Sequence, residues 1–297
     1  MGLETALGLA RVGHAVTVVG RDAGRGEAAV TRIRSEVPGA EVRFAQADMS
    51  SINDVPALGA SIAAEGPLDV LVNNVGGMYV DRLETKDGIE RSLMLNHIAP
   101  MILTDALIGV LTRAAPSRIV NITSAAISAS SMDFADIDAV GPYYGMAVTG
   151  RAKAMHLVHT NDLAEKLKVN GISVIAADPG GAATSNAAEM EVEMLPPPFR
   201  PYWDVISAGV QGSVADAAQS VVFAATNPSL DGRTGGRGRF GLHRRNGTGL
   251  SDRFRFDCGS EEAGRTPACT LGGHRRPLTI GLQHEVPVVQ RSAASCH

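Results

Sequence analysis

The apolar positions of residues 1–232 follow two alternating patterns. Short apolar runs rich in β-branched residues, which are typical of buried strands, occupy 14–20, 41–47, 68–73, 117–123 and 171–177. Segments with an apolar residue every three or four positions, which are typical of amphipathic helices, occupy 3–12, 23–36, 52–64, 90–113, 144–168 and 211–226. Strands that alternate with helices predict an α/β fold with a doubly wound parallel sheet covered on both faces. Ligands of such sheets bind at the carboxyl ends of the strands.

Charge divides the chain near residue 232. The whole chain has a formal charge of −4, whereas residues 233–297 hold 11 Arg, no Lys and five acidic residues, a net charge of +6. This segment has neither a helical nor a strand period over any useful length, so we expect a domain at 1–232 and an irregular basic tail at 233–297 that is disordered or translated out of frame. A basic arm for nucleic acid or lipid is the alternative, but the acidic chain as a whole disfavours nucleic acid as a partner.

Several classes of protein are excluded by composition. The three cysteines, Cys258, Cys269 and Cys296, are too few for a disulfide framework and favour a reducing, cytoplasmic compartment. No apolar run reaches the length of a membrane span, and the start lacks the basic region of a secretory signal. The cysteines and histidines of the tail match no zinc spacing, so no metal site is expected.

Polar residues follow the predicted strands where a cofactor would bind. Arg21 follows the strand 14–20; an acid there would bond the ribose 2′-hydroxyl of NAD, whereas Arg suits the 2′-phosphate of NADP. Asp48 follows the next strand and would accept from an adenine amine, or would cap a helix. Asn74 lies in a segment at 73–77 whose glycines allow close backbone approach to a ligand or simply form a turn.

Two further strands end in candidate catalytic and binding residues. Ser124 follows the strand 117–123 and is a hydroxyl donor to a substrate oxygen or a helix cap. Lys153 lies on an apolar side of the helix 144–168 and is one of only four lysines against 23 arginines, although an exposed Lys is the usual interpretation. The loop after the last strand contains Pro179, Gly180 and Thr184, which are candidates for cofactor binding. We expect this loop to carry the Thr184 hydroxyl to the cofactor.

Taken in order, these stretches resemble the short-chain dehydrogenase/reductase family over residues 2–235. The resemblance is carried by NNVGG (73–77), KDGIERSLMLNHIAPMILT (86–104), RIVNITSAA (118–126), TGRAK (149–153) and DPGGAATS (178–185). The long segment between Ser124 and Lys153 resembles the retinol-dehydrogenase and protochlorophyllide-reductase branch. The resemblance implies a Rossmann-type sheet and a nicotinamide cofactor. It also implies that Asn96 holds a water in a proton relay, that Ser124 positions the carbonyl, and that Lys153 bonds the nicotinamide ribose and lowers the pKa of a neighbouring phenol.

Three features depart from the family pattern. Thr149 stands where the family has Tyr, four residues before Lys153, and an aliphatic hydroxyl is a far weaker acid than a phenol. Tyr143 and Tyr144 precede Lys153 by ten and nine residues, and Tyr144 is the candidate substitute. At the start, Gly2 matches only the last glycine of the family's TGxxxGxG turn, so the first strand and most of that turn are missing. The third departure is the tail, which resembles nothing in the family.

We therefore expect an NADP-dependent oxidoreductase that reduces a ketone or aldehyde by hydride transfer. The Arg-rich composition indicates GC-rich coding, and with the family branch it suggests a ketone of secondary metabolism, such as an anthracycline-type polyketide in antibiotic biosynthesis. Because Thr149 replaces the family Tyr, the alternative is a degenerate relative that binds nucleotide or a partner without turnover. A nucleic-acid binder that uses the tail is a third, weaker hypothesis. Family members often pair through two long helices, here 90–113 and 144–168, so a homodimer is expected.

Overall fold

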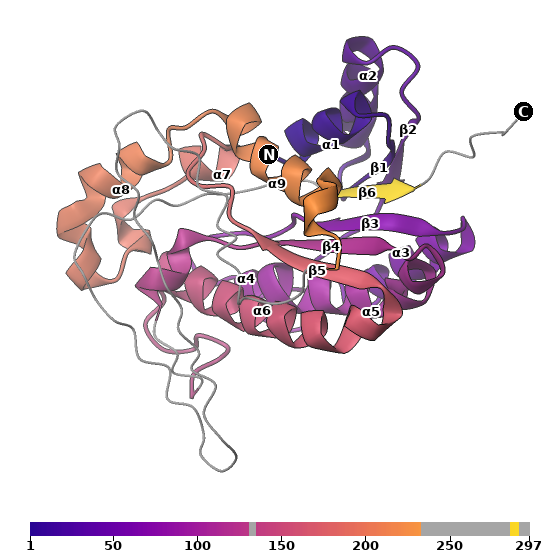
Figure 1. Ribbon diagram of the computed structural model, residues 1–297. Coiled ribbons are helices and arrows are strands. Elements are labelled where there is room, and N and C mark those ends of the chain that lie inside the picture. Colours follow the sequence, from indigo (N-terminus) through magenta and orange to yellow (C-terminus); the bar gives the residue numbers. More distant parts are fainter. Residues whose placement is uncertain (131–134, 233–285, 291–297) are drawn as a thin grey trace, which may run out of the picture.

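A six-stranded sheet with the order β2-β1-β6-β3-β4-β5 runs through the molecule (Figure 1). The computed structural model describes residues 1–130, 135–232 and 286–290. Its strands are β1 (Ala15–Gly20), β2 (Val42–Gln46), β3 (Leu68–Asn73), β4 (Ser117–Ile122), β5 (Ile172–Ala177) and β6 (Val286–Gln290). The pairs β1–β2, β3–β4 and β4–β5 are parallel. The predicted α/β fold is therefore confirmed, with its five strands close to the expected positions.

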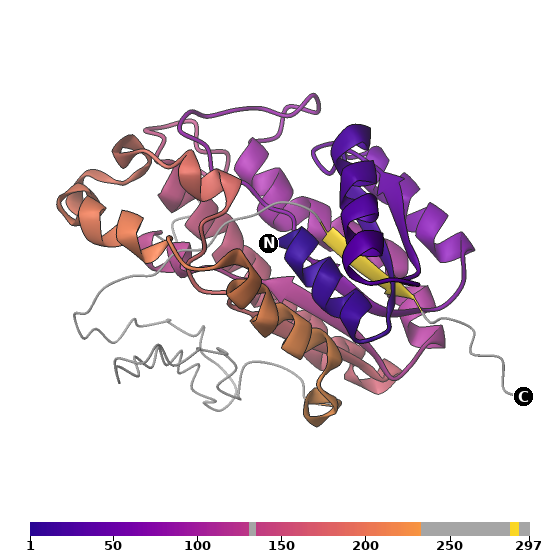
Figure 2. The same cartoon turned by 90° about the horizontal axis from the view of Figure 1, so that it is seen from above.

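Helices cover both faces of the sheet (Figures 1 and 2). One face carries α1 (Gly2–Arg11), α2 (Ala23–Glu36) and α9 (Val214–Thr226), and the other carries α3 (Asp54–Ala64), α4 (Arg91–Leu93), α5 (Ala99–Arg113) and α6 (Gly145–Leu167). Each face has its own apolar core, built on the first by residues such as Leu7 and Ile33 and on the second by residues such as Leu71 and Leu103. These cores arise because each helix places its apolar positions on one side, toward strands that are apolar on both faces.

Short helical elements connect these layers. A π-helical turn, Met94–Ile98, joins α4 to α5, and a 3₁₀ turn, Ala125–Ala129, follows β4. After β5 the chain forms a lobe at one end of the sheet with α7 (Ser185–Ala188) and α8 (Trp203–Gly209). The lobe has an apolar core of its own, which includes Met78, Met146 and Ile206.

Residues 286–290 form the strand that lies between β1 and β3. β6 pairs antiparallel with both β1 and β3, with Val289 opposite Val16 and Val288 opposite Leu71. Two neighbouring buried strands would otherwise leave backbone amides and carbonyls without partners, and an extended segment satisfies them. The expectation that 233–297 contains no regular structure is therefore wrong for these five residues. The remainder, 233–285 and 291–297, lies outside the described residues, and the boundary near 232 stays a prediction.

The helical segment from Arg91 to Arg113 passes a test of length and composition for crossing a membrane, alone among the described residues. Its most apolar window is 56% buried inside the fold. The buried side chains of α5, among them Leu103 and Leu107, belong to the core between α5, α3 and the sheet. An apolar helix in this position is explained by core packing.

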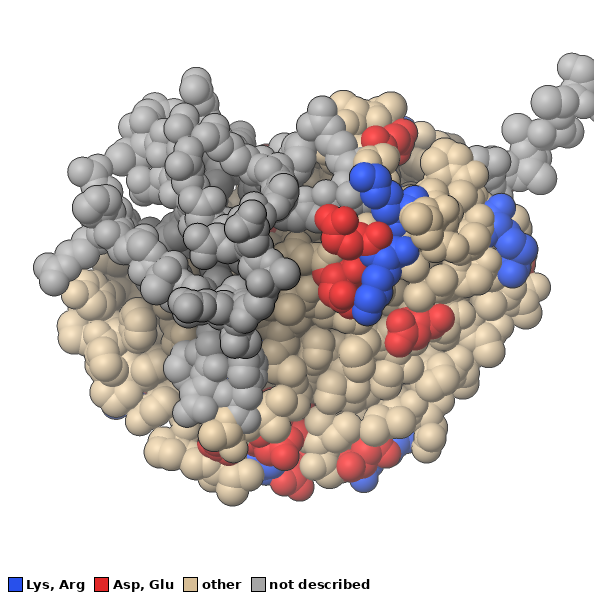
Figure 3. All heavy atoms as spheres, turned by 60° about the horizontal axis from the view of Figure 1, so that its bottom comes forward, with Lys and Arg blue, Asp and Glu red and all other residues tan. Residues whose placement is uncertain are grey.

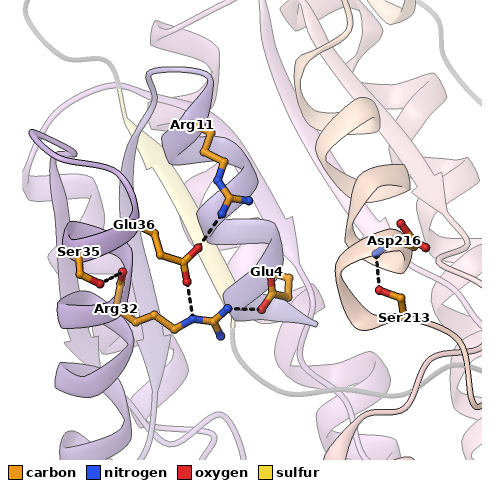
Figure 4. A network of polar contacts seen from close by, with 7 residues as sticks. All are labelled: Glu4, Arg11, Arg32, Ser35, Glu36, Ser213 and Asp216. Atoms are coloured by element: carbon orange, nitrogen blue, oxygen red, sulfur yellow. Dashed lines mark hydrogen bonds and ion pairs between the residues drawn. The ribbon is translucent and has the colours of Figure 1, made fainter.

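Ion pairs hold α1 against α2 beside the sheet (Figure 4). Arg11 Nη2 lies 2.6 Å from Glu36 Oε2, and the Arg32 guanidinium lies 2.8 Å from both Glu36 Oε1 and Glu4 Oε1. On the other side of α1, Ser213 Oγ caps α9 by accepting from the amide of Asp216 at 3.3 Å. Partly exposed pairs stabilise by about 0–1 kcal/mol each, so together they help to fix how α1 lies against α2.

Candidate active site

The predicted site residues gather at the carboxyl ends of the parallel strands. Arg21 directly follows β1, Asn74 directly follows β3, and Asp48 and Ser124 come two residues after β2 and β4. Because these strands are parallel, their carboxyl ends share one edge of the sheet. The loop after β5, with Pro179, Gly180 and Thr184, ends at the same edge.

Two glycines let α6 approach these loops closely. A Cβ atom on Gly150 would lie 2.1 Å from the carbonyl oxygen of Ala126, in the turn after Ser124. A Cβ atom on Gly145 would lie 2.0 Å from the carbonyl oxygen of Tyr79, in the loop after β3. Only glycine fits at such distances. α6 therefore lies against the loops at the ends of β3 and β4, with Thr149 and Lys153 on its buried side.

Lys153 is buried at the centre of this region. It is 6% exposed, and its Nζ donates a hydrogen bond to the carbonyl oxygen of Ile122, the last residue of β4, at 2.7 Å. Burial disfavours the ammonium form and lowers the pKa of Lys153 to about 8. The exposed-lysine interpretation is therefore wrong. The side chain can hold or release a proton near neutral pH.

Thr149, at the family's tyrosine position, has its hydroxyl committed inside the protein. Its Oγ1 lies 2.8 Å from Ser92 Oγ and 3.1 Å from the carbonyl oxygen of Gly77, and Ser92 Oγ also reaches that carbonyl at 2.9 Å. Whichever hydroxyl donates to the other, the second donates to Gly77, so both protons are used. Thr149 is 1% exposed. This arrangement leaves no Thr149 proton for a bound carbonyl.

Asn96 belongs to the same cluster. Its Nδ2 lies 2.8 Å from the carbonyl oxygens of Gly77 and Ser92 and 3.0 Å from Ser92 Oγ. Its Oδ1 is buried with no hydrogen-bond partner among the described residues, so it is able to accept from a donor. Asn96 lies in the middle of the π-helical turn, an irregularity that is frequent at functional sites.

Ser124 combines the two interpretations that the sequence left open. Its Oγ accepts a hydrogen bond from the amide of Ala126 at 3.2 Å and so caps the turn Ala125–Ala129. Accepting that bond leaves the hydroxyl proton available to a substrate oxygen. Ser124 is buried on the edge where α6 brings Lys153.

The two neighbouring tyrosines differ in their surroundings. The Tyr143 hydroxyl donates to Glu90 Oε1 at 3.2 Å, and burial together with this carboxylate raises the pKa of Tyr143 strongly. Burial also raises the pKa of Glu90, which caps α4. Tyr144 begins α6, and the guanidinium of Arg200, from the lobe, lies 6.0 Å from its ring centroid. Tyr143 is thus poorly suited as an acid, and Tyr144 faces the lobe.

The cofactor side of the edge contains two residues that the sequence did not single out. The Arg91 guanidinium lies 5.0 Å from the ring centroid of Tyr79, a cation–π contact. Burial raises the pKa of Asp48. Two hydrogen bonds from Ser50 and the charges of Arg21 and Arg91 lower the pKa by more, so that overall it lies below its usual value. Two cationic side chains therefore act on one carboxylate beside β2. In the sequence, the one signal for a role of Arg91 at this site is its position at the start of a helix.

The remaining candidates shape backbone at the site. Asp178 Oδ1 accepts from the amide of Gly180, whose φ of +70° favours glycine, and Thr184 caps α7 through a hydrogen bond from Ala187. Gly2 is buried at the first position of α1, and no side chain caps this helix. Uncapped amides at a helix start suit an anion such as a diphosphate. The residues at this edge of the sheet therefore fit a dinucleotide, and Arg21, Asp48 and Gly2 are the candidates to hold its adenosine and phosphates.

Comparisons with known proteins place the chain in a family. The short chain dehydrogenase family profile matches residues 1–194. Retinol dehydrogenase 14 of Mus musculus is 28% identical over 246 residues, which are 79% of this chain and 73% of that protein. Retinol dehydrogenase 13 of Homo sapiens is 34% identical over 186 residues, which are 62% of this chain and 56% of that protein.

Solved structures agree. The Pseudomonas aeruginosa RhlG/NADP active-site complex has a TM-score of 0.58 at 26% identity and covers 76% of this chain and 85% of its own. A short-chain dehydrogenase from Sphingobium yanoikuyae in complex with NADPH has a TM-score of 0.53 at 29% identity and covers 63% and 70%. The resemblance to the retinol-dehydrogenase branch is thereby confirmed. The chain belongs to the short chain dehydrogenase family of NAD(P)-dependent oxidoreductases.

Proposed function

We propose that this chain is an NADP-dependent reductase of a ketone or aldehyde. The observation that carries the proposal is the buried Lys153, with its pKa near 8, on the same strand edge as the free hydroxyl proton of Ser124. When bound, the cofactor supplies the hydride. Ser124 donates a hydrogen bond to the carbonyl oxygen and orients it, and Lys153 holds a proton next to β4.

A preference for NADP is supported by two arginines. Arg21 directly follows β1, where the adenosine ribose binds in dinucleotide folds. The positive charges of Arg21 and Arg91 both lower the pKa of Asp48. Guanidinium groups pair strongly with phosphate oxygens. Two relatives by structure are themselves NADP or NADPH complexes. We therefore place the 2′-phosphate at Arg21.

A bulky, apolar carbonyl compound suits the lobe after β5. The core of the lobe brings Met78 and Met146, near the start of α6, together with Met194, and Phe199 and Trp203 pack against them. Relatives named retinol dehydrogenase suggest the same class. An aromatic polyketide ketone of antibiotic biosynthesis and a retinoid aldehyde both belong to it.

One observation favours a second candidate function, a nucleotide-binding relative without turnover. Thr149 has no phenol to offer, and its hydroxyl proton is already used by Ser92 or Gly77. In that case the cofactor edge of the sheet would remain, and the chemical step would be lost. The two functions therefore agree on cofactor binding and differ only on catalysis.

The test has two stages. Titration of the purified chain with NADPH and with NADH measures binding, which both candidates predict, with NADPH the tighter ligand. NADPH oxidation is then followed with a panel of aromatic ketones and apolar aldehydes, with Lys153→Ala as the control that should lose turnover. Turnover that depends on Lys153 supports the reductase. Tight NADPH binding with no oxidation on any compound supports the second candidate.

We also propose that the chain works as a cytoplasmic homodimer that pairs through α5 and α6. The side of the molecule that carries these helices shows uncharged areas between clusters of charged side chains (Figure 3). Val158, on α6, is 61% exposed. The mass in solution by light scattering tests the pairing, and Val158→Glu should shift a dimer toward monomer.

A further inference from the structure

Three imidazole rings form a cluster between the π-helical turn and α6. His97 comes from the turn, and His156 and His159 come from successive turns of α6. The ring centroids lie 5.9 Å apart for His97 and His156, 6.1 Å for His97 and His159, and 6.2 Å for His156 and His159. None of these histidines has a part in the site described above, yet the cluster adjoins it, because His97 directly follows Asn96.

The cluster holds polar atoms that the described residues do not satisfy. His156 is 3% exposed, and neither of its ring nitrogens has a hydrogen-bond partner among the described residues. The same holds for Nδ1 of His97 and Nε2 of His159. Buried polar atoms without partners destabilise a fold, so such a group indicates a role. Leucine in place of His156 would carry no such penalty.

The imidazoles are neutral at physiological pH. Burial lowers the pKa of all three, for His97 to about 4. Further groups act on them: the charge of Lys153 and the other two imidazoles lower the pKa of His156, while Asp105 and Asp162 raise and Lys166 lowers that of His159. A neutral imidazole has one N–H donor and one acceptor nitrogen. It can therefore accept a proton at one nitrogen and release one from the other.

The cluster extends from Lys153 toward the surface. His156 follows Lys153 by three residues on α6, so the two side chains are neighbours on one face of the helix. His97 and His159 are half-buried and lie on the outer side of His156. Lys153 itself is buried, and the hydroxyl proton of Thr149, one turn earlier, is already used. The histidines offer a route to Lys153 that avoids Thr149.

We propose that His156, with His97 and His159, passes protons between solvent and Lys153. In turnover, which rests on the proposed reductase function, each carbonyl takes up one hydride from the cofactor and one proton from the protein. The lost proton is replaced from solvent: it binds an outer imidazole, and a proton leaves the opposite nitrogen and passes through an intervening water to His156. His156 in the same way, again through a water, returns Lys153 to its ammonium form. Protons balance, and no electron moves in this relay.

The chain's four lysines make Lys153 directly observable. Protein labelled with ¹⁵N and ¹³C only in lysine gives side-chain signals from Lys86, Lys153, Lys166 and Lys168, and Lys153→Arg assigns the relevant one. Exchange of the Lys153 Nζ protons with solvent is measured at low temperature in wild type and in His156→Gln, which keeps a polar amide but cannot relay a proton. His14→Gln, at a half-buried histidine on the strand edge away from α6, is the matched control.

We expect His156→Gln to slow Lys153 exchange by about tenfold or more, in line with the size of proton-transfer effects, and His14→Gln to leave it unchanged. Equal Lys153 exchange in wild type and His156→Gln would overturn the path. If His156→Gln does not fold, His159→Gln, at a half-buried position, should slow exchange in the same direction, and its failure to do so would overturn the path equally.

Turnover separates this inference from the proposed function. Slow Lys153 exchange in His156→Gln, combined with a wild type that oxidises no NADPH, would leave the path standing and reject the reductase. Where wild type turns over, His156→Gln should lower kcat and leave the Kd for NADPH unchanged. Slowed exchange with an unchanged kcat would reject the reloading role of the path.

Discussion

Thr149 Oγ1 lies 2.8 Å from Ser92 Oγ, and both hydroxyls reach the carbonyl oxygen of Gly77. The two residues are 57 positions apart in the chain, and together they turn the family's tyrosine position into a closed hydrogen-bond cluster. A residue that would deliver a proton in the family pattern instead ties the start of α6 to the loop after β3.

Thr149→Val tests this structural role. Valine has the shape of threonine but no hydroxyl, so Ser92 and Gly77 lose a partner in a buried place. We expect the free energy of unfolding to fall by about 1–3 kcal/mol, with any NADPH oxidation unchanged, as measured by denaturant unfolding and kcat. A loss of kcat without a loss of stability would show that the Thr149 proton takes part in the reaction.

Thr149→Tyr tests the missing phenol. A tyrosine here would place a phenol one turn before Lys153, whose charge would make it more acidic, and we expect turnover to rise by about 10²-fold, the usual size of general acid catalysis. Tyr144→Phe should change little in that variant but should abolish activity in the wild type if Tyr144 is the acid. A gain that persists when Lys153→Ala is added would contradict the role given to Lys153.

Arg21→Asp tests the cofactor preference. A charge-assisted arginine–phosphate contact contributes about 1.5–3 kcal/mol, so the Kd for NADPH should rise by about ten- to a hundredfold while that for NADH stays the same. Arg91→Met should weaken NADPH binding less, because its guanidinium lies over the Tyr79 ring. Arg113→Asp, at the far end of α5, serves as the control. An equal loss for both cofactors in Arg21→Asp would contradict the assignment.

Truncation after residue 285 tests the place of β6. Without it, β1 and β3 lose the strand that pairs with both of them. Each lost backbone hydrogen bond costs about 0.5–1.5 kcal/mol, so the shortened chain should unfold at a clearly lower denaturant concentration. A chain truncated after residue 291, which keeps β6, is the matched control. Equal stability of the two chains would instead support the expectation from sequence that the tail adds nothing to the fold.

The histidine cluster predicts how stability depends on pH. His97 has a pKa of about 4 in the fold against an ordinary value of 6.5, and the pKa values of His156 and His159 are also lowered. Between pH 6.5 and about 4 these histidines are protonated in the unfolded chain but not in the folded one. The free energy of unfolding is therefore highest above about pH 7 and falls as the pH drops from 6.5 toward 4. Thermal unfolding at several pH values measures this slope. His156→Leu should flatten it, and an unchanged slope would show that other groups dominate.

Much of the fold follows from local patterns. The apolar runs at 68–73 and 117–123 became β3 and β4 within a residue, because a strand buried on both faces needs continuous apolar side chains over a few positions. Arg21, Asn74 and Ser124 lie at one edge of the sheet, since a residue that follows a parallel strand is carried to the same edge as its counterparts. The burial of Lys153, by contrast, is decided by packing, because the usual interpretation of a lysine in sequence is an exposed one.

Tertiary structure alone decided which side chains meet at that edge. The contact of Thr149 with Ser92, the cation–π contact of Arg91 with Tyr79 and the cluster of His97 with α6 join segments that have no periodic relation in sequence. β6 is the clearest case: a short segment near the end of the chain lies between β1 and β3 because their backbone groups need partners, a demand that arises only once the sheet has assembled. Local sequence determines the elements and the places where they end, whereas long-range packing determines which polar atoms satisfy one another.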